Sequence, residues 1–306
     1  LYTAKGAVKP FQAEVKGKIL EYAWWLKKNG RSEQTIKGRI KLLNSLAKVC
    51  NIMDPEHVKL VIAEAKWNIN SKRLTVTVYD DFAKFAGLSW EKPKYRKVET
   101  LPFIPLEKEI DQLIASCSKR ISALLQLLKE TGVRIGEAVR LRWIDLDVQR
   151  KTVTVQPEKG SNPRIFNISE NLCRMLNGLR KKNDFIFGNP NPDEIRKQFI
   201  IQRKRAAQKL NNPRIRKISF HSIRHWKGTM EYHRTKDPWY VKKLLGHKSL
   251  KTTEVYINIE QALFQEQNDE FHVKTAQTPE EIKALLEVGF EYVCQKDGIM
   301  FFRKRK

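Results

Sequence analysis

Three short motifs rich in arginine, histidine and tyrosine follow one another in the second half of this chain, and their order is its most constraining feature. Segment 131–137 reads TGVRIGE, and segment 220–225 reads FHSIRH. Segment 244–256 places His247 nine residues before Tyr256. Each motif alone is ordinary, since a lone tyrosine in an amphipathic helix is nearly always core or surface. Together, in one order, they are hard to obtain by chance.

This order of an arginine, then His-x-x-Arg, then a histidine and a tyrosine resembles that of the tyrosine recombinase (phage integrase) family. The resemblance implies that Arg134 and Arg224 hold a DNA phosphate, because a planar guanidinium binds two nonbridging oxygens and stabilises the charge of the transition state. Tyr256 is implied as the nucleophile. A phenol with a pKa of about 10 needs a base, which is His221 by analogy, and His247 would hydrogen-bond the phosphate.

Two further residues complete the implied site. The family carries a basic residue on a β-hairpin between the first two motifs, and Lys159 lies where that turn is expected. It would protonate the leaving 5′-oxygen, although Lys151 or Arg164 could take this role and hairpin turns often carry lysine for solubility. Glu137, one turn beyond Arg134, would orient that arginine by hydrogen bonding.

Each site residue also has an ordinary structural interpretation. Arg134 could be a surface arginine, and His221 a helix-capping histidine. His247 follows a glycine and could cap a turn, whereas Tyr256 could be a half-buried helix aromatic. The spacing of the motifs favours catalysis. Rival nucleophiles, which are Tyr232 and Tyr240, lack that spacing.

The implied activity is site-specific recombination or integration of duplex DNA through a 3′-phosphotyrosine, without metal, ATP or another cofactor. The implied partners are double-stranded DNA attachment sites, with a homotetramer on two duplexes and a monomer or dimer off DNA. A type IB topoisomerase-like nicking and resealing enzyme and a DNA-binding protein that no longer cuts remain alternatives. The short basic C-terminal extension is similar to that of archaeal virus or plasmid integrases.

Composition agrees with a nucleic-acid partner. The chain has 306 residues, a net charge of +25 and a pI near 9.9, which favours a polyanion, with an anionic membrane as the competitor. No window approaches the roughly 18 apolar residues of a membrane span, and no signal-peptide layout is seen. We expect a cytoplasmic, nucleoid-associated protein in the host cell of a mobile element. Four scattered cysteines predict no zinc site.

The patterns predict a mainly α fold with a small antiparallel β-sheet (α+β), arranged as a two-domain clamp. A helical core-binding domain is expected over 1–90, a basic linker over 91–105, a catalytic domain over 106–265, and an extension with a helix, a hairpin and a basic tail over 266–306. Candidate DNA-binding residues on the basic helix faces and in the linker are Lys37, Arg39, Lys41, Lys94, Arg96, Arg203 and Lys204.

Local patterns sharpen this outline. Segment 74–85 alternates β-branched residues like a strand but also keeps helical spacing, and we predict a helix. A strand meander is expected over 145–168, a helix over 279–286, and a hairpin over 290–302 that turns at 296–298. Because the sequence begins at Leu1 rather than methionine, we expect its native start to lie upstream.

Overall fold

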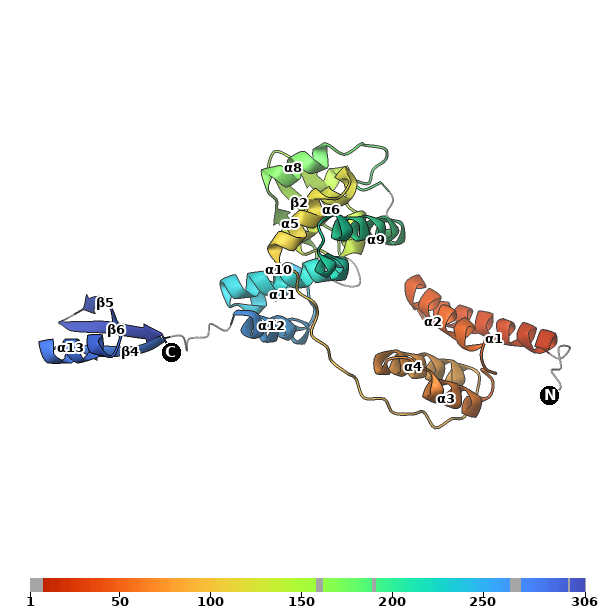
Figure 1. Ribbon diagram of the computed structural model, residues 1–306. Coiled ribbons are helices and arrows are strands. Elements are labelled where there is room, and N and C mark those ends of the chain that lie inside the picture. The colour runs from red at the N-terminus through yellow and green to blue at the C-terminus, as the bar shows by residue number, and fades with distance from the viewer. Residues whose placement is uncertain (1–7, 158–161, 189–190, 265–270, 297, 306) are drawn as a thin grey trace. The chain divides into compact units, whose positions relative to one another are not determined.

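The computed structural model describes residues 8–157, 162–188, 191–264, 271–296 and 298–305 (Figure 1). The chain divides into two compact units, Leu1–Thr100 and Leu101–Lys306. Most described residues are helical, and the strands form two small antiparallel sheets. The predicted fold class is therefore confirmed. In the described part of the chain, no helix has the length and apolar character needed to cross a bilayer.

Within residues 8–100, the N-terminal unit has four helices. Three begin at side-chain caps: Ser32 accepts a hydrogen bond from the backbone of Thr35, Asn68 accepts one from that of Ser71, and Asp54 precedes a proline at the first helical position. The buried rings of Tyr22 and Phe82 meet edge to face, 5.5 Å between centroids. The helices are α1 (Val8–Lys28), α2 (Glu33–Leu46), α3 (Pro55–Glu64) and α4 (Ile69–Phe85).

The predicted helix over 74–85 is confirmed as the second half of α4. Its threonines fit a helix because Thr75 and Thr77 donate to the carbonyls one turn earlier, those of Ser71 and Arg73. Residues 88–106, which follow, form no helix or strand.

The second unit builds its main core around α6 (Lys119–Thr131) and α10 (Phe220–Thr235), which pack against each other. The other helices that the structure describes up to residue 264 are α5 (Glu107–Ala115), α7 (Ile135–Val139), α8 (Glu170–Asn177), α9 (Pro192–Lys209), α11 (Pro238–Leu245) and α12 (Glu254–Phe264), with short 3-10 turns at Trp143–Asp145, Pro213–Lys217 and Leu250–Thr252. Helix α10 also contacts α11 and α12.

The predicted strand meander is confirmed as β1 (Leu146–Asp147), β2 (Thr152–Val155) and β3 (Arg164–Asn167), in the order β1-β2-β3. Val153 pairs with Phe166 and Val155 with Arg164. Because side chains alternate along a strand, all four of these residues face the core and are buried.

The C-terminal segment forms a second small sheet with its own core. Its elements are β4 (Phe271–Ala276), α13 (Pro279–Glu287), β5 (Glu291–Lys296) and β6 (Ile299–Arg305), with strand order β4-β6-β5. The predicted helix and the antiparallel pairing of the hairpin are confirmed. Strand β4 was not predicted, because its partner β6 lies more than 20 residues away and no turn motif joins the two.

Candidate active site

Five predicted site residues lie just after α6, in the first half of α10, or between the end of α11 and the start of α12: Arg134, His221, Arg224, His247 and Tyr256. Gly132 ends α6 in a left-handed conformation, with φ of 64°. A Cβ at Gly132 would lie 2.8 Å from a side-chain carbon of Leu245, so both backbone angle and space favour glycine. This turn leads directly to Arg134, the residue that precedes the first turn of α7.

Arg224 is a buried cation of the site that the backbone holds in place. It is 4% exposed, and its guanidinium donates to the carbonyl of Gly132 at 2.6 Å and to that of Leu245 at 2.7 Å. These bonds tie the end of α6 to the end of α11 and fix the guanidinium plane. Burial, and then repulsion by Arg134, lower the pKa of Arg224 to about 10. The group is therefore still a cation at neutral pH.

The buried carboxylate of Glu137 contacts two other arginines, Arg134 and Arg164. Glu137 accepts a hydrogen bond from Arg164 at 2.6 Å, and both side chains are nearly inaccessible. The same carboxylate accepts from the backbone N–H of Arg134 at 2.9 Å and lies 3.4 Å from its guanidinium. One negative charge thus positions two cations beside the site.

Arg164 is a site residue that sequence analysis considered only as a substitute for Lys159. It instead lies inside the domain and also donates to the carbonyl of Leu244 at 3.3 Å. The alternation of β3, in which Arg164 and Phe166 share the inner face, could have revealed it. Lys159 itself lies outside the described residues. Lys151 forms an exposed ion pair with Glu170 at 3.1 Å.

Tyr256 lies at the start of α12 and is 1% exposed. Its hydroxyl is 3.3 Å from Nδ1 of His225, and its ring is parallel to that of His247 with centroids 6.1 Å apart. Burial raises the pKa of Tyr256 to about 12, against the opposing effect of Arg224 and Arg134. At neutral pH the phenol is protonated and needs a base to attack.

The two histidines beside Tyr256 are neutral at neutral pH. Burial, followed by repulsion from neighbouring positive groups, lowers the pKa of His247 to about 3 and that of His225 to about 4. His247 is 7% exposed and its Nδ1 lies 3.0 Å from the hydroxyl of Thr253. Neutral imidazoles can accept a proton or donate one hydrogen bond, depending on the tautomer.

His225 is a residue that sequence analysis did not assign to the site. The sequence pointed to His221 as the partner of the tyrosine, and His221 is exposed one turn earlier on α10, with its ring centroid 6.3 Å from that of His225. The spacing of four residues places both rings on one helical face. That spacing is the signal that could have identified His225.

The candidate DNA-binding residues fall into two groups. Arg39 pairs with Asp81 and donates to the hydroxyl of Tyr22, and Arg203 donates to the carbonyl of Ile218, so both guanidiniums take part in packing within their own units. The other five are exposed: Lys37, Lys41, Lys94, Arg96 and Lys204. Among the described residues, no group of three or more His, Cys, Asp or Glu side chains is placed to hold a metal ion.

The helical fold and the site of arginines, histidines and a tyrosine define a class of DNA-rejoining enzyme. The sequence model of the phage integrase family matches residues 106–262, slightly more than half of the 306 residues. The chain belongs to the phage integrase family, which comprises the tyrosine recombinases. The resemblance inferred from the sequence, and with it the recombinase class of the enzyme, is confirmed.

Similar proteins span most of the chain. Tyrosine recombinase XerA of Pyrococcus furiosus is 26% identical over 261 residues, which cover 78% of this chain and 88% of that protein. Tyrosine recombinase XerC of Pediococcus pentosaceus is 28% identical over 193 residues, covering 56% and 62%.

Solved structures with the same fold include a lambda integrase dimer bound to a COC′ core site. Its TM-score is 0.58 with 15% identity, covering 81% of this chain and 80% of that one. XerH recombinase bound to its difH substrate gives a TM-score of 0.56 with 17% identity, covering 87% and 99%. A lambda integrase tetramer bound to a Holliday junction gives 0.59 with 14% identity, covering 79% and 76%.

Proposed function

We propose that this protein is a site-specific DNA recombinase or integrase that cuts and rejoins duplex DNA through a 3′-phosphotyrosine. The phenolic oxygen of Tyr256 attacks the phosphorus, the P–O5′ bond breaks, and the 5′-oxygen takes up a proton and leaves as a hydroxyl. The new ester keeps the energy of the broken bond, so the 5′-hydroxyl of another strand displaces Tyr256 without ATP. The supporting observation is the convergence of Tyr256, Arg224, His247 and Arg134 within one chain.

Arg134 and Arg224 bind the nonbridging oxygens of the scissile phosphate in this proposal. Two N–H groups of Arg224 already donate to the backbone, at Gly132 and Leu245, which fixes the direction of those that remain for a phosphate. Such preorganised donors stabilise the developing phosphorane without reorganising during the reaction. His247, held by Thr253 through Nδ1, would donate its Nε2–H to the same phosphate.

The geometry favours a different base for Tyr256 than the His221 expected from the sequence. The 3.3 Å contact between the Tyr256 hydroxyl and Nδ1 of His225 favours His225 as the first acceptor of the phenolic proton. In this role the neutral ring carries its own proton on Nε2. His221, exposed on the same face of α10, would then hydrogen-bond the phosphate. Protonation of the leaving 5′-oxygen by Lys159 stays a prediction.

Tyr256 acts in cis in this proposal, because the hydroxyl meets His225 of its own chain. The buried phenol, 1% exposed, must be uncovered before it reaches a phosphate. The net charge of +25 supports a DNA partner. The fold shared with a lambda integrase tetramer on a Holliday junction supports a homotetramer on two DNA duplexes.

The helical domain over 1–90 and the basic linker over 91–105 would close on the duplex opposite the catalytic domain over 106–265. Their exposed cations would bind backbone phosphates, which position a protein on DNA without reading its sequence. An enzyme acting on attachment sites would work in the cytoplasm, at the nucleoid.

The decisive experiment is covalent trapping on nicked, labelled duplexes from candidate attachment sites. We expect a denaturation-resistant protein–DNA complex with the wild type and none with Tyr256→Phe, which removes only the nucleophilic oxygen. An adduct that survives in Tyr256→Phe contradicts the assignment. Relaxation of supercoils without recombinant products would favour a topoisomerase-like enzyme, and tight binding without cleavage on any duplex would favour a non-cutting DNA-binding protein.

A further inference from the structure

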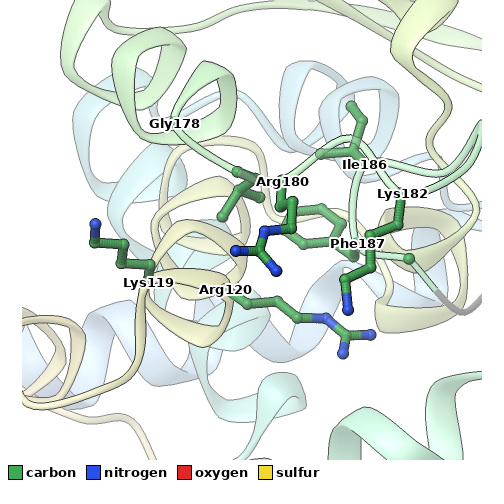
Figure 2. Close-up of a pocket in the computed structure, with 9 residues that line it drawn as sticks. Lys119, Arg120, Gly178, Arg180, Lys182, Ile186 and Phe187 are labelled. Carbon is green, nitrogen blue, oxygen red and sulfur yellow. The ribbon is translucent and has the colours of Figure 1, made fainter.

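A second cationic site lies at the opposite end of α6 from the catalytic arginines. A cavity of about 410 Å³ opens between the start of α6 and segment 178–188 (Figure 2). Helix α6 has 13 residues, so its two ends are about 20 Å apart. The volume lies within the range of about 300–1,000 Å³ typical of ligand sites.

The described residues that line this cavity include four cations and no carboxylate. The cations are Lys119, Arg120, Arg180 and Lys182. Figure 2 shows the charged ends of Arg120, Arg180 and Lys182 around the same space, whereas Lys119 extends away from it. Like charges gathered in this way repel each other, and an anion between them removes that repulsion.

The inner wall of the cavity is apolar. Ile186 and Phe187 are 2% and 1% exposed and line it beside the cations. An apolar wall lowers the local dielectric constant, which strengthens the attraction between a cation and a bound anion.

Arg120 supplies the most specific observation. Its Nε and Nη2 atoms are buried and have no hydrogen-bond partner among the described residues. Nη2 lies beside Gly188, where a Cβ would be 3.7 Å away from it. The third nitrogen, Nη1, is 3.8 Å from a carboxylate oxygen of Glu194, which is too long for a hydrogen bond. A buried donor without an acceptor costs about 1–3 kcal/mol. Arg120 therefore has donors that the described residues do not satisfy, at the wall of the cavity that it lines.

The charge at the start of α6 points the same way. Lys119 and Arg120 are its first two residues, and its first turn has no acidic side chain. Cations at the positive end of a helix are unfavourable, whereas an anion there is favourable. Both the charges at the start of α6 and the unsatisfied nitrogens of Arg120 therefore favour a bound anion.

We propose that this cavity binds a phosphate group at a site separate from the catalytic one, with Arg120, Arg180 and Lys182 as its ligands. Forked guanidinium donors and an ammonium are the groups that proteins use for phosphate oxygens. The phosphate can be a free anion, such as phosphate or pyrophosphate, or part of a DNA backbone outside the cleaved segment. The free-anion form does not depend on the proposed recombinase activity.

Thermal unfolding of the full chain with pyrophosphate, against sodium chloride at equal ionic strength, tests the proposal. At about five times Kd, a single site raises Tm by about 2–4 °C. The variant Arg180→Ala/Lys182→Ala should lose this rise, and both side chains are exposed, so the fold should tolerate the change.

The matched control is Lys181→Ala/Arg150→Ala, which removes the same charge. Lys181 lies over the ring of Trp143 and Arg150 is exposed, and neither lines the cavity. This control should keep the rise in Tm. The variant Arg134→Ala should also keep it, which excludes binding at the catalytic arginines.

Binding of duplex DNA at several salt concentrations separates the two sources of phosphate. If DNA supplies the phosphate, the Arg180→Ala/Lys182→Ala variant should show a shallower slope of log K against log salt concentration, by about 0.9 per lost phosphate contact. If a free anion supplies the phosphate, this slope should stay unchanged. Equal Tm rises in this variant and the wild type, or no rise beyond chloride in either, would overturn the proposal. With DNA at a saturating concentration, the Tyr256 adduct should form in this variant at the wild-type rate, so failure of this site and failure of the proposed function are distinguishable.

Discussion

Alanine at position 228 should displace the nucleophile without removing any catalytic group. Gly228 is buried in α10, and a Cβ there would lie 2.7 Å from Cζ of Tyr256 and 2.8 and 2.9 Å from its Cε atoms. Carbon atoms in contact prefer about 3.5–4.0 Å, so the ring must move by about 1 Å. A displacement of that size can lower the rate of the chemical step on the order of 10²-fold.

The effect on stability should be small by comparison. Alanine is favoured over glycine in a helix interior by about 1 kcal/mol, whereas overpacking a buried site costs about 1–3 kcal/mol. We therefore expect the free energy of unfolding to fall by about 0–2 kcal/mol. A loss of activity with a nearly unchanged fold would locate the effect at Tyr256.

Single-turnover formation of the covalent adduct on a nicked duplex measures the rate, and urea unfolding measures stability. The matched control is Gly38→Ala in α2, where a Cβ meets nothing within 4 Å. It should be neutral or stabilising by up to about 1 kcal/mol and leave the adduct rate unchanged. Adduct formation at the wild-type rate in Gly228→Ala would refute the idea that this close contact sets the position of the phenol.

Three further predictions follow from the charges of the site. Glu137→Gln removes the negative charge that pairs with buried Arg164 and should lower the free energy of unfolding in urea by about 3–5 kcal/mol. The control Glu21→Gln, in an exposed pair with Lys18, should lower it by about 0–1 kcal/mol. Equal losses in the two variants would contradict this prediction. Burial lowers the pKa of His225 to about 4 and that of His247 to about 3. The unfolded chain therefore binds more protons below pH 6.5, so the free energy of unfolding should fall as the pH decreases from 6.5 toward 4 and then 3, by up to about 1.4 kcal/mol per pH unit for each ring. A flat stability between pH 7 and 5 would disprove it. His225→Phe should slow adduct formation by about 10²–10⁴-fold and alter its pH profile, and a wild-type rate would return the role of base to His221.

The sequence by itself determined the class of this protein. The spacing of its motifs, from Arg134 to Tyr256, indicated the family, and local periodicity predicted the helices and strands, because both are properties of neighbouring residues. Segment 74–85 shows the limit of such patterns, since β-branched alternation and helical spacing coincide there. Packing against the other helices of the N-terminal unit resolves it as helix.

Only the tertiary structure decided which atoms of these residues meet. Arg224 bonds the carbonyl of Gly132, 92 residues away, and Tyr256 meets His225 across two helices. Such contacts depend on how α6, α10 and α12 pack, and no local pattern encodes that geometry. The same holds for the cavity beside Arg120, whose walls come from segments about 60 residues apart. The sequence lists the charged groups, but burial decides their pKa values and their partners.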